Sequence, residues 1–261
     1  MLNRWGKPRF VSGVPGDAFG EGGQKWCHPL YNTEELRKQN YSLLFDRMAF
    51  AAAFYDVTRI DHFQAIAMFY AIPAKGQPRQ GHWEQGVGEP FVRRLAEQIG
   101  KEKIVVEDFG GFPGNAKALA KKYGLGDMQV LQFTLRDGKT AKSYPENTVA
   151  YLGTHDNCPF CGFLEEMDDP SLAMVAKLLG QENSRDKQIL CQAAIEALLD
   201  CPAVRTVFQV QDLLFEGNQC RMNIPSTSGH SNWTYRLTEE KLAALEKDAG
   251  LWRQRIEKYD R

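Results

Sequence analysis

The stretch Arg59-Ile60-Asp61-His62-Phe63 decides the fold prediction, because charged residues here close an apolar segment. The apolar run Phe50–Phe54 and the lead-in Tyr55–Thr58 precede it, which is typical of a short buried strand at residues 57–61. Side chains alternate along a strand, so Arg59 and Asp61 are expected on one face, where they can pair. A neighbouring guanidinium favours the ionised form of a carboxylate. The pair is therefore either a structural ion pair at a sheet edge or part of an active site with a fixed anion.

The same arrangement recurs along the chain, where short apolar strands end in polar or acidic residues. Further strands are predicted at 103–106, 128–133, 149–153 and 204–210. Helices are predicted at 32–54, 89–100, 115–123, 170–179, 184–200 and 239–258. Strands that alternate with helices indicate βα units in a parallel sheet, and functional residues at strand carboxyl ends are typical of a (β/α)8 TIM barrel.

A closed barrel of this type needs eight strands, and only about five are predicted. The sequence therefore predicts an α/β fold of the TIM-barrel type that is partial, with the first strands missing. Residues 1–261 are expected to form a single domain. Two segments, 10–31 and 64–87, show no helix or strand period and are predicted to be irregular. Trp26 in the first segment either stacks on a flat ligand such as a sugar or packs beneath the loop.

Composition and charge narrow the classes of function. The 261 residues carry 32 Lys and Arg against 33 Asp and Glu, a net charge of −1. This balance gives no electrostatic reason to expect a nucleic-acid partner or an anionic membrane. No apolar run approaches the length of a membrane span, and no secretory signal opens the chain, so a cytoplasmic protein is expected.

The six cysteines include one C-x-x-C motif, Cys158-Pro-Phe-Cys161. A zinc site would need a second ligand pair at similar spacing, and a thioredoxin-type site would need this pair at a helix start in a small βαβ domain. The sequence supplies neither context. Free thiols are therefore expected, and no metal is predicted.

Three predicted strand ends carry acids, at Asp61, Glu107 and Asp156. A retaining glycosidase needs an ionised nucleophile and a protonated acid/base about 5 Å apart. Glu107 follows the apolar run Ile104–Val106, surroundings that suit a raised pKa and hence a general acid. Asp156, next to His155, is suited to binding sugar hydroxyls. Each acid alone could be an exposed loop carboxylate, and only their joint position at strand ends favours a site.

Motifs spread over residues 11–236 resemble the 4-α-glucanotransferases, the amylomaltase or disproportionating-enzyme family of the α-amylase clan. The motifs that carry the resemblance are Gly13-Val-Pro-Gly-Asp-Ala-Phe19, Gly23-Gln-Lys-Trp26, Pro29-Leu-Tyr31, Arg59-Ile-Asp-His-Phe63, Glu107-Asp108, Tyr151-Leu-Gly-Thr-His-Asp-Asn157 and Arg221-Met-Asn223. The resemblance implies an enzyme that breaks an α-1,4 bond, holds the glucan as a covalent glycosyl-enzyme and passes it to the 4-hydroxyl of another sugar. It implies no organic cofactor and no catalytic metal.

The resemblance also implies roles for individual residues. Asp61 resembles the catalytic nucleophile, Glu107 the general acid/base and Asp156 the transition-state stabiliser. The implied substrate-binding residues are Arg59, His155, Trp26, Asn223, Gln24, His62 and Asn157. The expected partners are maltooligosaccharides and α-glucans.

The family's catalytic domain is much longer than this chain, and its earlier barrel strands would precede the loop that begins near residue 11. Three explanations are open. The chain is a fragment of a longer gene, a truncation completed by a missing barrel half or by self-association, or an inactive remnant. The leading hypothesis is a 4-α-glucanotransferase that uses a retaining double displacement. A non-catalytic glucan-binding or assembly remnant and an α-glucan hydrolase are the alternatives.

Overall fold

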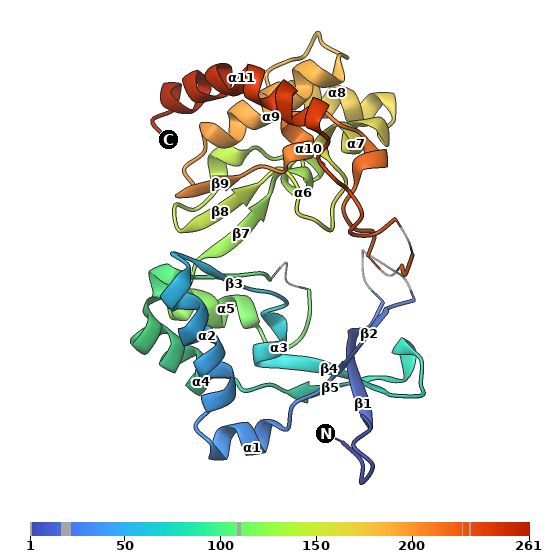
Figure 1. Ribbon diagram of the computed structural model, residues 1–261, viewed down its shortest axis with the longest axis vertical. Helices are drawn as coiled ribbons and strands as arrows, with labels where there is room; N and C mark the ends of the chain where they lie inside the picture. The colour runs from blue at the N-terminus through green and yellow to red at the C-terminus, as the bar shows by residue number, and fades with distance from the viewer. Residues whose placement is uncertain (1, 17–21, 109–110, 226, 230) are drawn as a thin grey trace. The chain divides into compact units, whose positions relative to one another are not determined.

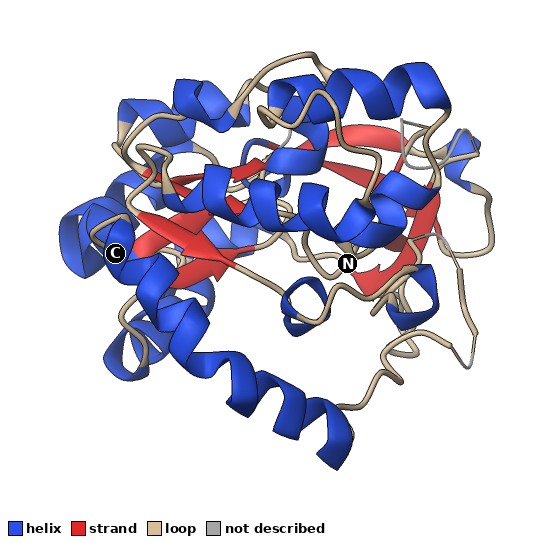
Figure 2. Ribbon diagram, turned by 90° about the horizontal axis from the view of Figure 1, so that it is seen from above, coloured by secondary structure: helices blue, strands red, loops and turns tan. Residues whose placement is uncertain are grey.

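The computed structural model describes residues 2–16, 22–108, 111–225, 227–229 and 231–261. Phe19 of the first motif lies outside the described residues. The chain divides into two compact units, Met1–Met128 and Gln129–Arg261 (Figure 1), and each is described by itself. Both units mix helix and strand, as the colours of Figure 2 show. No described helix is long and apolar enough to cross a membrane.

The first unit contains the strand that leads to Asp61. This strand, β3 (Thr58–Ile60), pairs in parallel with β6 (Ile104–Val106), with Arg59 opposite Val105. All three residues of β6 are buried. Val105 also forms a parallel bridge to Gly126, just before the next strand. The parallel pairing predicted for these two strands is confirmed.

Short helices accompany this parallel pair in the first unit. They are α1 (Thr33–Lys38), α2 (Ser42–Phe54), α3 (Gln64–Ala67), α4 (Glu89–Leu95) with a π-helical turn at Ala96–Gly100, α5 (Ala116–Lys122), and 3-10 turns at Pro78–Gln80 and Lys101–Lys103. The Asn32 side chain caps α1 by accepting from two backbone N–H groups. The single helix predicted at 32–54 is wrong, because Asn40 and Tyr41 adopt φ of 50° and 58° and separate α1 from α2.

A four-stranded antiparallel sheet contradicts the irregular structure predicted for 10–31 and 64–87. Its order is β2-β1-β4-β5, with β1 (Phe10–Val14), β2 (Gln24–Pro29), β4 (Met68–Pro73) and β5 (His82–Gln85). Only a few apolar side chains form its core, so the alternation in the sequence is weak. Gly13 allows β2 to approach β1, since a Cβ there would lie 2.1 Å from the Gln24 carbonyl oxygen.

The second unit holds most of a three-stranded sheet in the order β7-β8-β9. The strands are β7 (Asp127–Val130), in which the unit boundary falls, β8 (Thr148–Tyr151) and β9 (Arg205–Val207). β8 and β9 are parallel. The strands predicted at 128–133 and 204–210 extend too far, because helices α6 (Leu131–Arg136) and α10 (Val210–Leu213) begin inside those ranges.

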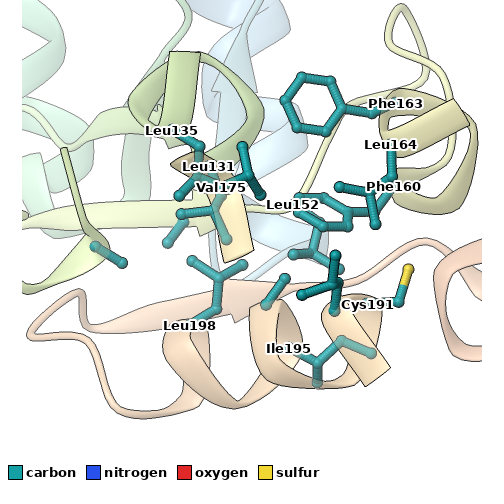
Figure 3. Packing of buried hydrophobic residues seen from close by; sticks show 14 of the residues in the cluster. Leu131, Leu135, Leu152, Phe160, Phe163, Leu164, Val175, Cys191, Ile195 and Leu198 are labelled. Carbon is teal, nitrogen blue, oxygen red and sulfur yellow. The ribbon is translucent and has the colours of Figure 1, made fainter. Parts of the chain in front are cut away.

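The core of the second unit lies between its sheet and four of its helices. These are α7 (Phe160–Glu165), α8 (Asp169–Leu178), α9 (Lys187–Leu199) and α11 (Glu239–Lys258), with 3-10 turns at Ala141–Ser143 and Asn218–Cys220. Figure 3 shows Phe160 and Phe163 of α7 packed with Ile195 and Leu198 of α9 in one buried cluster. Of the last three predicted helices, α11 is confirmed at its predicted bounds and α8 and α9 are confirmed with small changes at their ends, whereas α7 was not predicted.

Candidate active site

Asp61 lies one residue beyond the carboxyl end of β3, and Arg59 holds it there. Arg59 Nη2 lies 2.8 Å from Asp61 Oδ1, so the ion pair expected from the alternation along the strand is present. The Asp61 side chain is 73% exposed, whereas that of Arg59 is 29% exposed. Arg59 Nε also lies 3.1 Å from Met128 Sδ. The arrangement anchors the cation and leaves the carboxylate open to a ligand.

Glu107 occupies the corresponding position one residue beyond β6. Its backbone N–H donates to the Ile60 carbonyl at 2.9 Å, and its carbonyl accepts from Phe63 N–H at 2.8 Å. These bonds continue the ladder between β3 and β6 past the strand ends. Asp61 and Glu107 therefore follow two adjacent parallel strands, and the Glu107 backbone is fixed through both its N–H and its carbonyl.

Burial sets the chemistry of the Glu107 carboxyl. Removal from water, with a smaller contribution from the charge of Asp61, raises the pKa of Glu107 to about 6. The backbone N–H of His62, which donates to Glu107 Oε2 at 2.6 Å, and the Arg59 guanidinium oppose this rise in pKa. The raised pKa expected from the apolar run before Glu107 is confirmed. Such a carboxyl keeps part of its proton near neutral pH, as a general acid must.

Three of the predicted substrate-binding residues form a cluster beside this pair of acids. His62 turns the chain after Asp61 with φ of 46°. Its ring packs edge-on against Trp26, with the ring centroids 4.8 Å apart. Trp26 Nε1 in turn donates to Gln24 Oε1 at 3.0 Å, and the two residues share a face of β2 because they are two apart. The half-buried Trp26 ring is thus oriented by contacts on two sides.

The second unit carries the third acid, in the loop Gly153–Pro159 between β8 and α7. Asn223 Nδ2 donates to Asp156 Oδ1 at 2.7 Å. On the other oxygen, His155 Nε2 lies 3.4 Å from Asp156 Oδ2. The predicted residues His155, Asp156 and Asn223 are therefore brought together, although they come from segments about 65 residues apart.

Asn157, also predicted to bind substrate, is buried and serves the loop itself. Its Oδ1 accepts from the Thr154 backbone N–H at 2.8 Å and from Thr154 Oγ1 at 2.9 Å. The Asn157 backbone N–H also donates to the Thr154 carbonyl at 2.9 Å, so these bonds together close a turn around His155 and Asp156. The contact of Asn157 with substrate stays a prediction.

Two residues beside Asp156 were missed by the sequence reasoning. Arg221 Nη2 donates to the Asp156 carbonyl at 2.6 Å. Trp233 is 55% exposed, and the centroid of its ring lies 5.2 Å from that of the His155 ring. Arg221 belongs to a quoted motif in which only Asn223 was given a role. Trp233 lies in no quoted motif and follows no predicted strand, so no local signal marked it.

The first unit therefore brings together Arg59, Asp61, His62, Glu107, Trp26 and Gln24, and the second brings together His155, Asp156, Asn157 and Asn223. Each group is formed within its own unit. The meeting of all three acids at one site stays a prediction.

The C-x-x-C cysteines are both buried in the second unit. Cys161 Sγ lies 3.1 Å from Cys191 Sγ on α9, whereas Cys158 Sγ lies 4.0 Å from Gln132 Oε1. Burial raises the pKa of the Cys158 thiol to about 11, which makes it a poor nucleophile. Among the described residues, no group of three or more His, Cys, Asp or Glu side chains is placed to hold a metal ion.

Comparison with known proteins gives the family. A profile of the family described as 4-alpha-glucanotransferase matches residues 3–242. This chain belongs to the 4-alpha-glucanotransferase family. It is 33% identical over 267 residues to the chloroplastic/amyloplastic 4-alpha-glucanotransferase of Arabidopsis thaliana, with 100% of this chain and 46% of that protein covered. It is 32% identical over 251 residues to the 4-alpha-glucanotransferase of Thermus thermophilus, with 93% and 50% covered.

A solved structure supports the same conclusion. Amylomaltase from Streptococcus agalactiae in complex with acarbose matches with a TM-score of 0.90 and 27% sequence identity, covering 100% of this chain and 52% of that one. The expected family and the α/β fold of the TIM-barrel type are confirmed. The chain spans about half the length of the relatives that it matches.

Proposed function

We propose that this chain carries the catalytic residues of a 4-α-glucanotransferase that acts on maltooligosaccharides and α-glucans by a retaining double displacement. The observation that carries the proposal is a pair of unlike carboxyls beyond two adjacent parallel strands. Asp61 is exposed and paired with Arg59, while burial raises the pKa of Glu107 to about 6. Unlike environments divide the roles of nucleophile and acid between two carboxyls. Membership of the glucanotransferase family supplies the substrate class.

In the first displacement, the Asp61 carboxylate attacks the anomeric carbon of the donor sugar, and the α-1,4 bond breaks. Glu107 gives its proton to the departing 4-oxygen, so the leaving glucan departs as an alcohol. A glycosyl ester of Asp61 remains. The Glu107 carboxylate then takes the proton from the 4-hydroxyl of an acceptor glucan, whose oxygen attacks the same carbon and releases Asp61. Two inversions retain the α configuration.

The other residues hold the sugar during these steps. Asp156, with His155 and Asn223 against its two oxygens, is assigned to the hydroxyls of the donor ring and to the positive charge that develops on it. Trp26 and Gln24 on β2 are assigned to sugar binding next to His62. Acceptor transfer in place of hydrolysis requires that water be kept from the glycosyl ester.

Incubation of the purified protein with maltotriose tests the proposal. Glucose and a ladder of oligomers longer than maltotriose are expected. Asp61→Asn should abolish the ladder, since an amide cannot form the glycosyl ester. Asp56→Asn is the matched control, because Asp56 is an exposed carboxylate before the same strand. Glucose and maltose alone would indicate a hydrolase, and glucan binding without products would indicate the non-catalytic alternative.

Two finer expectations belong to this proposal. Completion of the barrel by another chain segment or by self-association is one of them. A cytoplasmic location is the other, and the Arabidopsis relative is named as chloroplastic/amyloplastic. Size in solution and localisation of the tagged protein in cells would measure them.

A further inference from the structure

The loop Gly153–Pro159 is held through its backbone carbonyls by side chains from outside it. Gln209, which lies between β9 and α10, provides the first contact. Its Nε2 donates to the Gly153 carbonyl at 3.1 Å and to the Thr154 carbonyl at 3.0 Å. An amide NH2 has two N–H groups, so one side chain can satisfy both acceptors. The bonds join the segment after β9 to the segment after β8, its parallel neighbour.

Arg221 provides the second contact, directly at the third acid. Its Nη2 donates to the Asp156 carbonyl at 2.6 Å, and its Nε donates to the Asn223 carbonyl at 2.8 Å. Asn223 in turn donates to Asp156 Oδ1 at 2.7 Å. One guanidinium therefore fixes the backbone of Asp156 and the backbone of the residue that binds its carboxylate. Hydrogen bonds from a charged donor are stronger than those from a neutral one.

Gln132 at the start of α6 provides the third contact. The residue is 2% exposed, and its Nε2 donates to the Cys158 carbonyl at 2.8 Å. Its backbone N–H also donates to the Leu152 carbonyl at 3.3 Å, at the other end of the loop. A Cβ at Gly153 would lie 2.7 Å from Gln132 Nε2. Glycine at 153 therefore leaves room for the buried amide.

From these contacts we infer that Gln132, Gln209 and Arg221 are positioning residues for the transfer reaction. They act on the carbonyls of Gly153, Thr154, Asp156 and Cys158, and so determine where the Asp156 carboxylate and the His155 ring lie. The effect on rate rests on the proposed function, whereas the hold on the loop does not. Misplacement of a catalytic group by about 1 Å can cost about 100-fold in rate.

Kinetics of maltotriose transfer test the inference through Gln209→Met, which removes the donor at similar side-chain length, and Arg221→Met, which removes the guanidinium and keeps an unbranched apolar side chain. We expect kcat to fall by about 10- to 100-fold while KM changes by less than about threefold, because the loss falls on the transition state. Arg221→Lys should recover part of kcat, since its ammonium group can still reach the Asp156 carbonyl. Gln192→Met is the control, because it removes an amide that bonds to Glu196 Oε1 on α9, away from the loop.

Amide hydrogen exchange of the same proteins gives a readout that does not need activity. Gln209→Met and Arg221→Met should speed exchange of the Asp156 and Asn157 amides by about tenfold or more, and Gln192→Met should not. Unchanged exchange in the loop, an equal loss of kcat in Gln192→Met, or a rise in KM at constant kcat would overturn the inference. If Arg221→Met does not fold, Arg221→Lys, which keeps the charge, replaces it in both measurements. If the unaltered protein makes no transfer products, the proposed function fails, and hydrogen exchange still decides the positioning role.

Discussion

At the scale of single residues, Asp61 and Glu107 show how burial assigns unlike roles to like groups. They follow neighbouring strands, but the Asp61 side chain is largely exposed beside Arg59 while Glu107 is withdrawn from water. Alternation along a strand is local, so the Arg59–Asp61 pair could be predicted from the sequence. The apolar run before Glu107 is also local, and it predicted the direction of the pKa shift. The bond from His62 N–H to Glu107 Oε2 depends on the pairing of two strands and could not be predicted.

The raised pKa of Glu107 predicts a pH dependence of transfer. The protonated acid is the active form, so kcat/KM should fall as the pH rises through about 6 and the carboxyl loses its proton. Initial rates with maltotriose from pH 4.5 to 8 measure this limb. Glu107→Gln should remove most of the activity. Glu97 is an exposed carboxylate on the π-helical turn Ala96–Gly100 that follows α4, so Glu97→Gln should leave the profile unchanged. A profile that rises through pH 6 to 8 would contradict the assignment.

Trp233 predicts an effect on substrate affinity. Its ring is 55% exposed and lies beside His155, where it can stack on a sugar ring. Trp233→Ala should raise KM for maltotriose about three- to tenfold with a smaller change in kcat, consistent with about 1 kcal/mol of lost stacking. Trp5→Ala, which removes an exposed Trp of the first unit, is the control. Equal KM values for the two variants would exclude the stacking role.

At the scale of elements, helices with local signals could be predicted, whereas strands that depend on partners could not. The helix predicted at 239–258 matches α11 at both ends, and in the structure the Thr238 side chain caps its start by accepting from Lys241 N–H. The antiparallel sheet was missed, because its strands are short and are defined by their pairing. Leu131 and Val210 continue apolar runs but begin helices, so the composition of β7 and β9 extended the predicted strands beyond their ends.

The buried carboxyl of Asp212, which binds the start of α7, predicts how the stability of the protein depends on pH. Asp212 is fully buried, and its Oδ1 accepts from the Phe160 backbone N–H at 2.7 Å. Burial raises the pKa of Asp212 to about 7, against about 4 in an unfolded chain. The folded protein thus holds a proton that the unfolded chain releases. The stability that this proton contributes is fully present below about pH 4. As the pH rises through about 7, the free energy of unfolding therefore falls by about 4 kcal/mol.

Asp212→Asn tests this account, because asparagine keeps an acceptor oxygen for Phe160 but cannot ionise. The free energy of unfolding in urea should decline less between pH 4 and 7 in the variant than in the unaltered protein. Asp168→Asn is the matched control at the start of α8, where the exposed carboxylate accepts from Ser171 N–H and its pKa is lowered. An unchanged pH slope in Asp212→Asn would show that the buried proton is not the cause.

At the scale of the whole molecule, the succession of βα units could be predicted, and the division into two compact units could not. Five strands in the expected order gave the α/β class and the TIM-barrel type, which the amylomaltase match confirms. The contacts that join distant segments depend on side-chain packing, which no local pattern in the sequence encodes. The single domain expected for residues 1–261 is therefore still a prediction.

Calorimetry of two core variants tests that prediction. Leu95 belongs to the buried cluster of the first unit and Leu152 to that of the second. If the chain is one cooperative domain, Leu95→Ala and Leu152→Ala should each lower the midpoint of the same single transition, at a cost of about 2–5 kcal/mol. Two transitions, each shifted by only one of the variants, would contradict a single domain.

Trapping the glycosyl ester tests most directly whether Asp61 forms a covalent bond to the sugar. Glu107→Gln incubated with α-maltosyl fluoride, whose fluoride leaves without acid assistance, should accumulate the glycosyl-enzyme because the base of the second step is lacking. Trypsin then releases Ile60–Lys75, a peptide in which Asp61 is the only acidic side chain. We predict that mass spectrometry finds the maltosyl group on this peptide. A label on the peptide that contains Asp156, or no label in a protein that still performs transfer, would contradict the account.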